Sequence, residues 1–317
     1  MHMRTLKLLF VTLFTGTILS SCTDDRFIDD SISLGELLSS YELWYVDINR
    51  TTGTGEVPYV TRAFTLSFFN GNMYANNNIA GIGFTGNGLG IQVGNYNTFG
   101  ETLETFHDID GLHNFVVTQL SANEIRIYDS FANVSYLLIG YQRGNFDYDL
   151  LFYDNIEYFL QEYDAWEKRT AVGGEPNVFD DENYLQFTPE NNTTFYSSLD
   201  DLGMNLGDII WDFVGSYEVF DVQGLDDLKI LTLNYDGGDI EEFELSVIDD
   251  QNIRLYHLSS GRTYDFTGRG FIQFLRNSEN STAPVRNNGR KRTKIVRKVK
   301  ERKPVEVNTK RLRVTRR

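Results

Sequence analysis

Histidine and cysteine are scarce in this sequence, which contains four histidines and one cysteine and therefore has no cysteine-built zinc or iron–sulfur site. Two of the histidines, His107 and His113, flank the stretch Asp108-Ile109-Asp110-Gly111, and a related stretch, Asp236-Gly237-Gly238-Asp239, lies further along the chain. Calcium takes about six to eight oxygen ligands, and neither stretch has the EF-hand spacing that ends in a glutamate. We therefore expect two polar turns between strands and no metal site.

A glycine-rich stretch is the other candidate for chemistry. Gly81-Ile82-Gly83-Phe84-Thr85-Gly86 matches the pattern G-x-G-x-x-G, which binds dinucleotides where it joins a strand to the N-terminus of a helix. A dinucleotide site would need a helix to begin directly after Gly86, but further glycines follow there, up to Gly94. We expect a flexible loop or a glycine-bent strand, which could shape a ligand entrance. No Ser, His and Asp arrangement stands out, so the sequence predicts no catalytic centre and no cofactor.

Comparison of the chain with itself reveals an internal duplication. One apolar set with helical spacing returns 122 residues later: Leu34, Leu37, Leu38, Tyr41 and Trp44 correspond to Ile156, Phe159, Leu160, Tyr163 and Trp166. A second set returns 128 residues later: Phe115, Ile125, Arg126, Tyr128, Tyr136 and Gly140 correspond to Phe243, Ile253, Arg254, Tyr256, Tyr264 and Gly268. A repeat of this size predicts two homologous units, at residues 33–145 and 155–277.

Each unit is expected to open with a short helix and to continue in strands. Phe64 to Phe68 alternates between apolar and polar residues and leads into Asn70-Gly71, a dipeptide suited to a two-residue hairpin turn. Further strands are expected at 115–120, 124–128 and 135–141 in the first unit and at 243–248, 252–256 and 262–267 in the second. Short strands at this spacing, with 23 Phe and 18 Tyr in the chain, predict an all-β sandwich or closed barrel.

The N-terminus has the pattern of an export signal. Arg4 and Lys7 precede an apolar run over residues 8–19, which is too short to cross ~30 Å of hydrocarbon, and Ser20-Ser21 forms a small-residue cleavage site. Residues 22–32 are partly acidic and predict a tether, which serves either as a surface-export signal or simply as a soluble spacer. Taken alone, residues 1–21 fit an ordinary secretory signal, in which the cysteine at position 22 would stand by chance.

Two resemblances follow from these residues. Leu19-Ser20-Ser21-Cys22 resembles the lipobox of bacterial lipoproteins, which implies that Cys22 carries acyl chains such as palmitate and anchors the protein in a membrane. The short helix, Trp44 and Trp166, and the closing meander of each unit resemble the lipocalin-like lipoproteins of Gram-negative bacteria. This second resemblance covers about 230 of the 317 residues and implies two tandem lipocalin-like antiparallel barrels.

Chains of this general appearance are also labelled nicotinic acid mononucleotide adenylyltransferase. That class of enzyme uses a His-x-Gly-His element to meet the phosphates of ATP. The four histidines, His2, His107, His113 and His257, do not form this element. We therefore expect no adenylyltransferase activity.

Two arginines, Arg126 and Arg254, recur inside otherwise apolar strands. In an alternating strand they would simply face outward. The lipocalin resemblance implies instead a structural cation that stacks over Trp44 or Trp166 and closes the barrel.

The formal charge of -16 is distributed unevenly. Residues 22–285 carry 12 basic and 43 acidic side chains, whereas residues 286–317 carry 15 basic and 2 acidic ones. Such a basic block is usually disordered and solvated. It could instead bind an anionic polymer of the envelope or fold back on the acidic body, and nucleic acid is not expected as its main partner.

Together these features predict a signal peptide at 1–21, a tether at 22–32, barrels at 33–145 and 155–277, and a disordered basic tail at 278–317. We expect a non-enzymatic lipoprotein of the outer membrane, possessing a binding or scaffolding role and facing the periplasm or the cell surface. A barrel could hold a small apolar or glycan ligand. The alternative function is that of an extracytoplasmic hydrolase acting on an envelope or glycan substrate, which would need convergent carboxylates in an open pocket.

Overall fold

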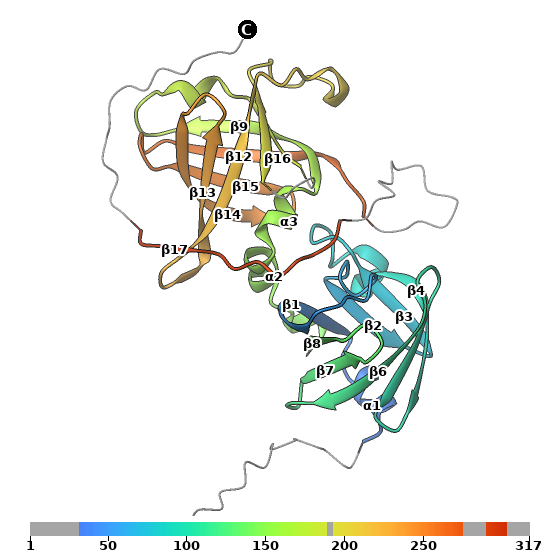
Figure 1. The fold of residues 1–317 in the computed structure, drawn as a ribbon. Helices are drawn as coiled ribbons and strands as arrows, with labels where there is room; N and C mark the ends of the chain where they lie inside the picture. The colour runs from blue at the N-terminus through green and yellow to red at the C-terminus, as the bar shows by residue number, and fades with distance from the viewer. Residues whose placement is uncertain (1–31, 189–192, 275–289, 303–317) are drawn as a thin grey trace, which may run out of the picture.

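The computed structural model describes residues 32–188, 193–274 and 290–302, and it contains two eight-stranded antiparallel β-barrels (Figure 1). Barrel 1 consists of β1 (Leu43–Gly53), β2 (Thr65–Phe69), β3 (Asn72–Asn76), β4 (Ile91–Phe99), β5 (Thr102–His107), β6 (Gly111–Gln119), β7 (Glu124–Asp129) and β8 (Val134–Tyr141). Barrel 2 consists of β9 (Tyr163–Val172), β10 (Tyr184–Phe187), β11 (Thr194–Ser198), β12 (Phe213–Val222), β13 (Leu225–Tyr235), β14 (Ile240–Asp249), β15 (Asn252–His257) and β16 (Thr263–Phe271). The predicted all-β class and the tandem of barrels are confirmed.

Both barrels close in the same register. In barrel 1 the first and last strands pair so that Trp44 lies opposite Gly140, and in barrel 2 Trp166 lies opposite Gly268. The Asn70-Gly71 turn between β2 and β3 has positive φ angles of 49° and 78° at its two residues, as the two-residue hairpin requires. The strands therefore follow the periodicity of the sequence, and the repeated residues occupy repeated positions.

Three short helices accompany the strands. Helix α1 (Leu34–Ser39) precedes barrel 1 and starts with a capping box, in which Ser33 N donates to Glu36 at 2.7 Å and Glu36 N donates to the Ser33 hydroxyl at 3.3 Å. Helix α3 (Ile156–Leu160) occupies the same place before barrel 2. Helix α2 (Tyr148–Asp154), which the sequence analysis did not predict, fills the connection and buries three of its side chains, Leu151, Phe152 and Tyr153.

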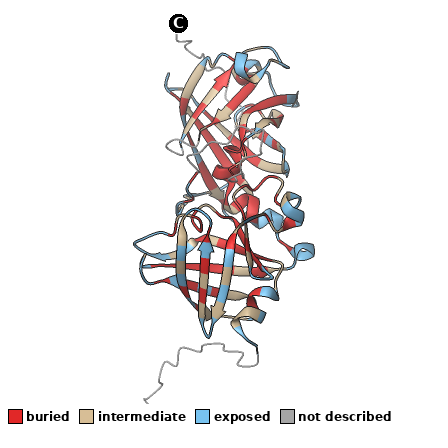
Figure 2. Ribbon diagram, turned by 90° about the vertical axis from the view of Figure 1, so that its right-hand side faces the viewer, coloured by how far each residue is buried: buried red, intermediate tan, exposed pale blue. Residues whose placement is uncertain are grey.

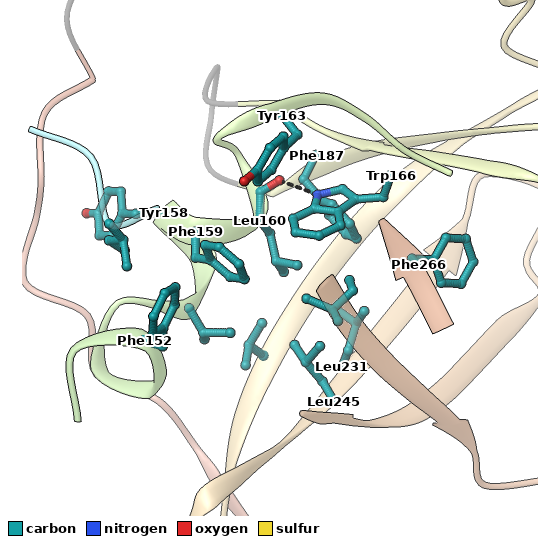
Figure 3. Close-up of a cluster of buried hydrophobic side chains, with 14 of the residues drawn as sticks. Phe152, Tyr158, Phe159, Leu160, Tyr163, Trp166, Phe187, Leu231, Leu245 and Phe266 are labelled. Carbon is teal, nitrogen blue, oxygen red and sulfur yellow. Dashed lines mark hydrogen bonds between the residues drawn. The ribbon is translucent and has the colours of Figure 1, made fainter. Parts of the chain in front are cut away.

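A tryptophan fastens each helix to its barrel. The Trp44 indole donates a hydrogen bond to Leu38 O at 3.0 Å, and the Trp166 indole donates to Leu160 O at 2.8 Å (Figure 3). Both indoles are fully buried. Because the indole N–H is satisfied by the last turn of the helix, the ring fills the barrel at no hydrogen-bonding cost.

A tyrosine and a glycine complete this closure. The Tyr41 ring packs edge-on against Trp44 at 5.0 Å, and the Tyr163 ring packs in the same way against Trp166 at 4.9 Å. A Cβ added to Gly140 would lie 2.5 Å from the Tyr41 ring, so only glycine leaves room for it. The tyrosine hydroxyls donate to backbone carbonyls of equivalent turns, at 2.9 Å to Ala122 O and 2.6 Å to Asp250 O.

Buried residues recur along the strands of both barrels (Figure 2), and their side chains pack inside each barrel. In barrel 1 the core contains a continuous apolar cluster that includes Trp44, Leu66, Phe68, Met73, Leu103, Phe115, Ile127 and Leu138. The core of barrel 2 continues through α2 and α3 into the side of barrel 1, where Tyr45, Phe64, Ile79 and Ile82 join the same cluster. The two barrels therefore share a hydrophobic core at the seam between them.

Residues 290–302 of the basic tail follow a defined path, which differs from the disorder expected there. They run in extended conformation along the seam and then along barrel 2, where β17 (Val299–Lys300) pairs in parallel with β12 (Figure 1). Residues 290–302 therefore fold back on the acidic barrels, which is one of the alternatives considered for the tail. Residues 1–31, 275–289 and 303–317 lie outside the described residues. These ranges contain the predicted signal, most of the predicted tether and the rest of the tail.

We predict that Gly140→Ala destabilises the protein by about 1–3 kcal/mol, because the new methyl group overlaps the Tyr41 ring in a well-packed barrel end. Gly144→Ala is the matched control, since a Cβ at that position meets nothing within 4 Å. Urea unfolding followed by tryptophan fluorescence measures both. Equal midpoints for the two variants would contradict the role given to the glycine.

Candidate functional site

Polar groups are buried together at the seam between the barrels. Glu162 lies between α3 and β9 and is fully buried. Its carboxylate accepts hydrogen bonds from Ile79 N and Ala80 N of barrel 1, each at 2.7 Å, and from the Arg290 guanidinium at 2.8 Å. Burial raises the pKa of Glu162, and the charge of Arg290 with these hydrogen bonds opposes that rise. One carboxylate thus joins barrel 2, barrel 1 and the tail.

Two arginines of the tail are buried in the same seam. The Arg290 guanidinium also donates to Tyr158 O and lies 4.3 Å from the centre of the Phe274 ring. Arg292 is 1% exposed; it donates to Asn155 Oδ1 at 2.8 Å and lies 4.3 Å from the centre of the Phe64 ring. Burial lowers the pKa of Arg292. Breaking one partner of such a buried contact leaves an uncompensated buried group, which is strongly destabilising.

The glycine-rich stretch belongs to this seam rather than to a ligand entrance. It forms the loop between β3 and β4, with a turn and the short 3₁₀ helix η1 (Thr85–Gly88), so the expected loop is confirmed and the strand-to-helix junction of a dinucleotide site is not formed. Gly81 N donates to Asp250 of barrel 2 at 3.2 Å. Just before it, Asn78 exchanges two hydrogen bonds with barrel 2, to Ile272 O at 2.9 Å and from Phe274 N at 2.8 Å.

A second buried polar group lies at the end of barrel 2 farthest from α3. His257 is 2% exposed, and its Nε2 lies 2.6 Å from Glu241. Its Nδ1 lies 2.7 Å from the Ser260 hydroxyl, which accepts hydrogen bonds from Asn177 Nδ2 at 3.0 Å and Arg262 N at 3.3 Å. Because that oxygen already accepts two protons, we assign its own proton to His257 Nδ1, which leaves Nε2 to donate to Glu241.

Barrel 1 contains the same pair with the two residue types exchanged. His113 lies 128 residues before Glu241, and Asp129 lies 128 residues before His257. His113 Nδ1 and Asp129 Oδ2 are 2.8 Å apart. The other oxygen of Asp129 accepts from two amides of the β7–β8 turn, as His257 receives a proton from the β15–β16 turn. In both barrels one side chain of the pair hydrogen-bonds to a turn and also to its partner on the neighbouring strand. We call this pair the clasp: His113 and Asp129 in barrel 1, and Glu241 and His257 in barrel 2.

This arrangement has the contacts of a serine hydrolase but not its exposure. Ser260, His257 and Glu241 form a hydroxyl, imidazole and carboxylate chain, which is the order of groups that activates a serine nucleophile. Ser260 is 7% exposed and accepts two further hydrogen bonds, one from Arg262 N within its turn and one from Asn177 Nδ2 in the segment before β10. The neighbouring Ser259 is exposed, with its hydroxyl 3.0 Å from His257 Nε2. This chain of groups does not stand out in the sequence, because the aligned positions of the two units carry different residue types at the 128-residue offset.

An aromatic residue plugs this end of each barrel. Tyr59, from the loop before β2, is 4% exposed, stacks on His107 at 4.5 Å and hydrogen-bonds to Thr105 at 2.7 Å. Phe179, from the loop before β10, is fully buried and packs 4.7 Å from Phe243. Burial raises the pKa of Tyr59, so its hydroxyl stays neutral. Each barrel is therefore closed by a helix and tryptophan at one end and by a buried ring at the other.

The structure separates the residues that were grouped from sequence as barrel-closing. Trp44 and Trp166 are fully buried, each with its indole bonded to the helix before its barrel. Arg126 is exposed on the outer face of β7, and Arg254 makes a two-pronged ion pair with Asp265 at 2.7 and 3.0 Å. This placement favours the outward-facing alternative for both arginines over stacking on a tryptophan. Cys22 lies outside the described residues.

The two stretches that suggested calcium are turns. Asp108 to Gly111 connects β5 to β6, and Asp236 to Asp239 connects β13 to β14. Within residues 32–188, 193–274 and 290–302, no three His, Cys, Asp or Glu side chains come together to hold a metal ion. None of the helices in the same parts of the chain has the length and apolar character to cross a membrane.

Comparison of the chain with models of known protein families gives no match, and comparison with curated protein sequences gives none either. The fold and the side-chain geometry therefore carry the functional argument.

We predict that the clasp can be transplanted between barrels. Each single variant, Glu241→His or His257→Asp, leaves two imidazoles or two carboxylates facing each other. We expect each to lower the free energy of unfolding by about 1–3 kcal/mol. The double variant recreates the His113 and Asp129 pair and should recover part of the loss, measured as a coupling energy in a double-mutant cycle of urea unfolding. Additive losses would contradict the equivalence of the two clasps.

We also predict a pH-dependent loss on Arg290→Met. Removing the cation leaves Glu162 buried and unpaired, at a cost of about 3–5 kcal/mol. The pKa of Glu162, already raised above 4.5, rises further in the variant, so its folded state binds a proton that the unfolded chain releases. The deficit relative to the unaltered protein is therefore largest at pH 8 and shrinks as the pH falls toward 4.5.

Melting temperatures of both proteins at pH 5 and pH 8 measure this effect. Lys298→Met is the matched control, because the ion pair of Lys298 with Glu218 is exposed and contributes about 1 kcal/mol or less. A deficit for Arg290→Met that is the same at both pH values would show that Glu162 does not titrate in the seam.

Proposed function

We propose that this protein is a non-enzymatic lipoprotein of the bacterial cell envelope, a binding or scaffolding module that acts through the outer surfaces of its two joined barrels. The observation that carries the proposal is the closure of both barrels at both ends, with cores packed by their own side chains. A ligand within a barrel would have to displace Tyr59 or Phe179 and the rings packed behind it. We therefore propose the outer surface as the place where a small apolar or glycan ligand would bind.

The lipid anchor is the second part of the proposal. Cys22 follows a leader with the lipobox pattern, and several acyl chains at ~0.8 kcal/mol per buried CH₂ hold a protein on a membrane. We place the protein at the outer membrane, facing the periplasm or the cell surface. The acidic barrels, with 12 basic and 43 acidic side chains over residues 22–285, would be repelled by anionic lipid, which favours attachment through the anchor.

The tail is proposed to contact an anionic polymer of the envelope through its last residues only. The charges of residues 290–302 largely meet carboxylates and carbonyls of the body. Residues 303–317 add six basic side chains and one acidic one. Lipopolysaccharide has the phosphates that such a segment binds, with an affinity that falls steeply as salt rises.

The hydrolase remains the second candidate, because Ser260, His257 and Glu241 are aligned as described above. It requires Ser260, or the exposed Ser259, to react as a nucleophile. A fluorophosphonate probe labels an activated serine covalently. We expect no labelling of either serine, since the hydrogen bonds of Ser260 and His257 stabilise the β15–β16 turn.

The test of the main proposal follows both the anchor and the barrels. Cells expressing the full chain are labelled with palmitate and fractionated, and Cys22→Ser should lose both the label and the membrane association. The soluble Cys22→Ser protein is then titrated with a fluorescent fatty acid. We expect no saturable uptake, because the barrel interiors are filled.

Stoichiometric uptake that is altered by Phe179→Ala would place a ligand inside barrel 2 and overturn the surface role. Fluorophosphonate labelling of Ser259 or Ser260 would favour the hydrolase. Retention of the label in Cys22→Ser would remove the lipid anchor from the proposal.

A further inference from the structure

The edge of β12 in barrel 2 binds an extended segment of the tail through its backbone. Among the residues that the structure describes, β11 and the residue before it pair with β12 up to Tyr217, and the later part of that edge pairs with the tail. Residues 298–300 occupy it: Asp221 N donates to Lys298 O at 3.0 Å and Gln223 N donates to Lys300 O at 3.1 Å. This is strand addition, in which main-chain bonds provide attachment and alternate side chains provide selectivity.

The selectivity here is a repeat of positive charge at every second residue. Alternate side chains of an extended segment point to the same side. Three of them meet glutamates on the outer face of β12 and β14: Lys298 with Glu218 at 2.7 Å, Lys300 with Glu242, and Arg302 with Glu244 at 2.6 Å. Between them, Val299 is 62% exposed. The pattern that fits this face is therefore Lys-x-Lys-x-Arg.

An aromatic ring strengthens the middle position. The Lys300 ammonium lies 3.8 Å from the centre of the Phe220 ring, which belongs to an apolar cluster with Val222 and Ile230 on the same face. A cation over an aromatic ring gains attraction beyond its ion pair. The face thus combines three acidic partners, one ring and an open strand edge, which together suit a basic extended peptide.

The part of the tail on this face is held less firmly than the part in the seam. Arg290 and Arg292 are buried and bind Glu162 and Asn155, and the Arg297 side chain is 7% exposed and binds Glu157. Lys298 and Arg302 are 74% and 58% exposed, and exposed ion pairs contribute little individually. The segment 298–302 can therefore leave the β12 face while the seam stays intact.

We propose that this face, formed by the open edge of β12 with Glu218, Phe220, Glu242 and Glu244, is a binding site for a basic extended segment of another protein chain with the pattern Lys-x-Lys-x-Arg. Residues 298–302 occupy the site in cis and limit access to it. This inference deepens the proposed binding role by naming the class of partner, and it does not depend on the anchor or on the barrel interiors.

The test uses the full soluble chain with Cys22→Ser and a fluorescent peptide, Val-Arg-Lys-Val-Lys-Glu-Arg-Lys-Pro, which copies residues 296–304. The variant Lys298→Ser, Lys300→Ser, Arg302→Ser weakens the segment that competes in cis. Fluorescence anisotropy at low salt should show peptide binding at least about tenfold tighter to this variant than to the unaltered chain, because the free fraction of the site rises. Binding should weaken as salt rises.

Two controls test the site and the pattern. Adding Glu218→Gln, Glu242→Gln and Glu244→Gln to the same variant should abolish binding. A peptide of the same composition whose basic residues are adjacent should bind several-fold more weakly, because its charges fall on both sides of the strand. Equal binding of both peptides, equal binding to both proteins, or no binding to the Ser variant would overturn the proposal.

If the Ser variant fails to fold, a chain that ends at Arg297 replaces it, since it keeps Arg290, Arg292 and Arg297. The same outcomes decide. The palmitate and fatty-acid experiments are unaffected by a negative result here, so a failure of this inference can be told from a failure of the proposed function.

Discussion

A single buried carboxylate sets how the parts of this protein fit together. A charged group without solvent is costly unless every side of it is satisfied, and Glu162 is satisfied by two amides of barrel 1 and one arginine of the tail. None of these partners belongs to the strands of barrel 2 that Glu162 precedes. The joint is therefore complete only when both barrels and residue 290 are in place, which favours one docking arrangement among the many that an apolar seam would tolerate.

The duplication explains the barrels, and the differences between the copies explain the joint. The helix, tryptophan, tyrosine and glycine of each barrel end recur in equivalent contacts. The clasp at the other end recurs too, although its acid and imidazole have changed places. In contrast, the glycine-rich loop of barrel 1 has no counterpart in barrel 2, and Asn114 and Val116 of barrel 1 stand at the positions of Glu242 and Glu244. The features that are new in one copy are those that hold the second copy or the tail.

The sequence predicted what local periodicity determines. Alternation, turn dipeptides and the repeat were enough for the barrels, for the hairpin at Asn70-Gly71, and for the places of Trp44 and Trp166. They were not enough for the seam, because Arg290 and Arg292 look the same in sequence as the solvated arginines of any basic tail. Only the fold shows that Glu162 and Asn155 accept hydrogen bonds from these two arginines. The clasp was within reach of sequence, since His113 and Asp129 align with Glu241 and His257 once unlike residues are allowed to correspond.

The path of residues 290–302 also has a consequence for the order of events when the chain is made. These residues leave the ribosome after both barrels, so the residues of the seam from both barrels are made before the cation that neutralises Glu162. Until then Glu162 is held by backbone amides alone, and the barrels have an incomplete joint. A chain that has lost its C-terminus, by premature termination or by proteolysis, would carry that defect permanently. The tail thereby couples the final assembly of the protein to the completeness of its synthesis.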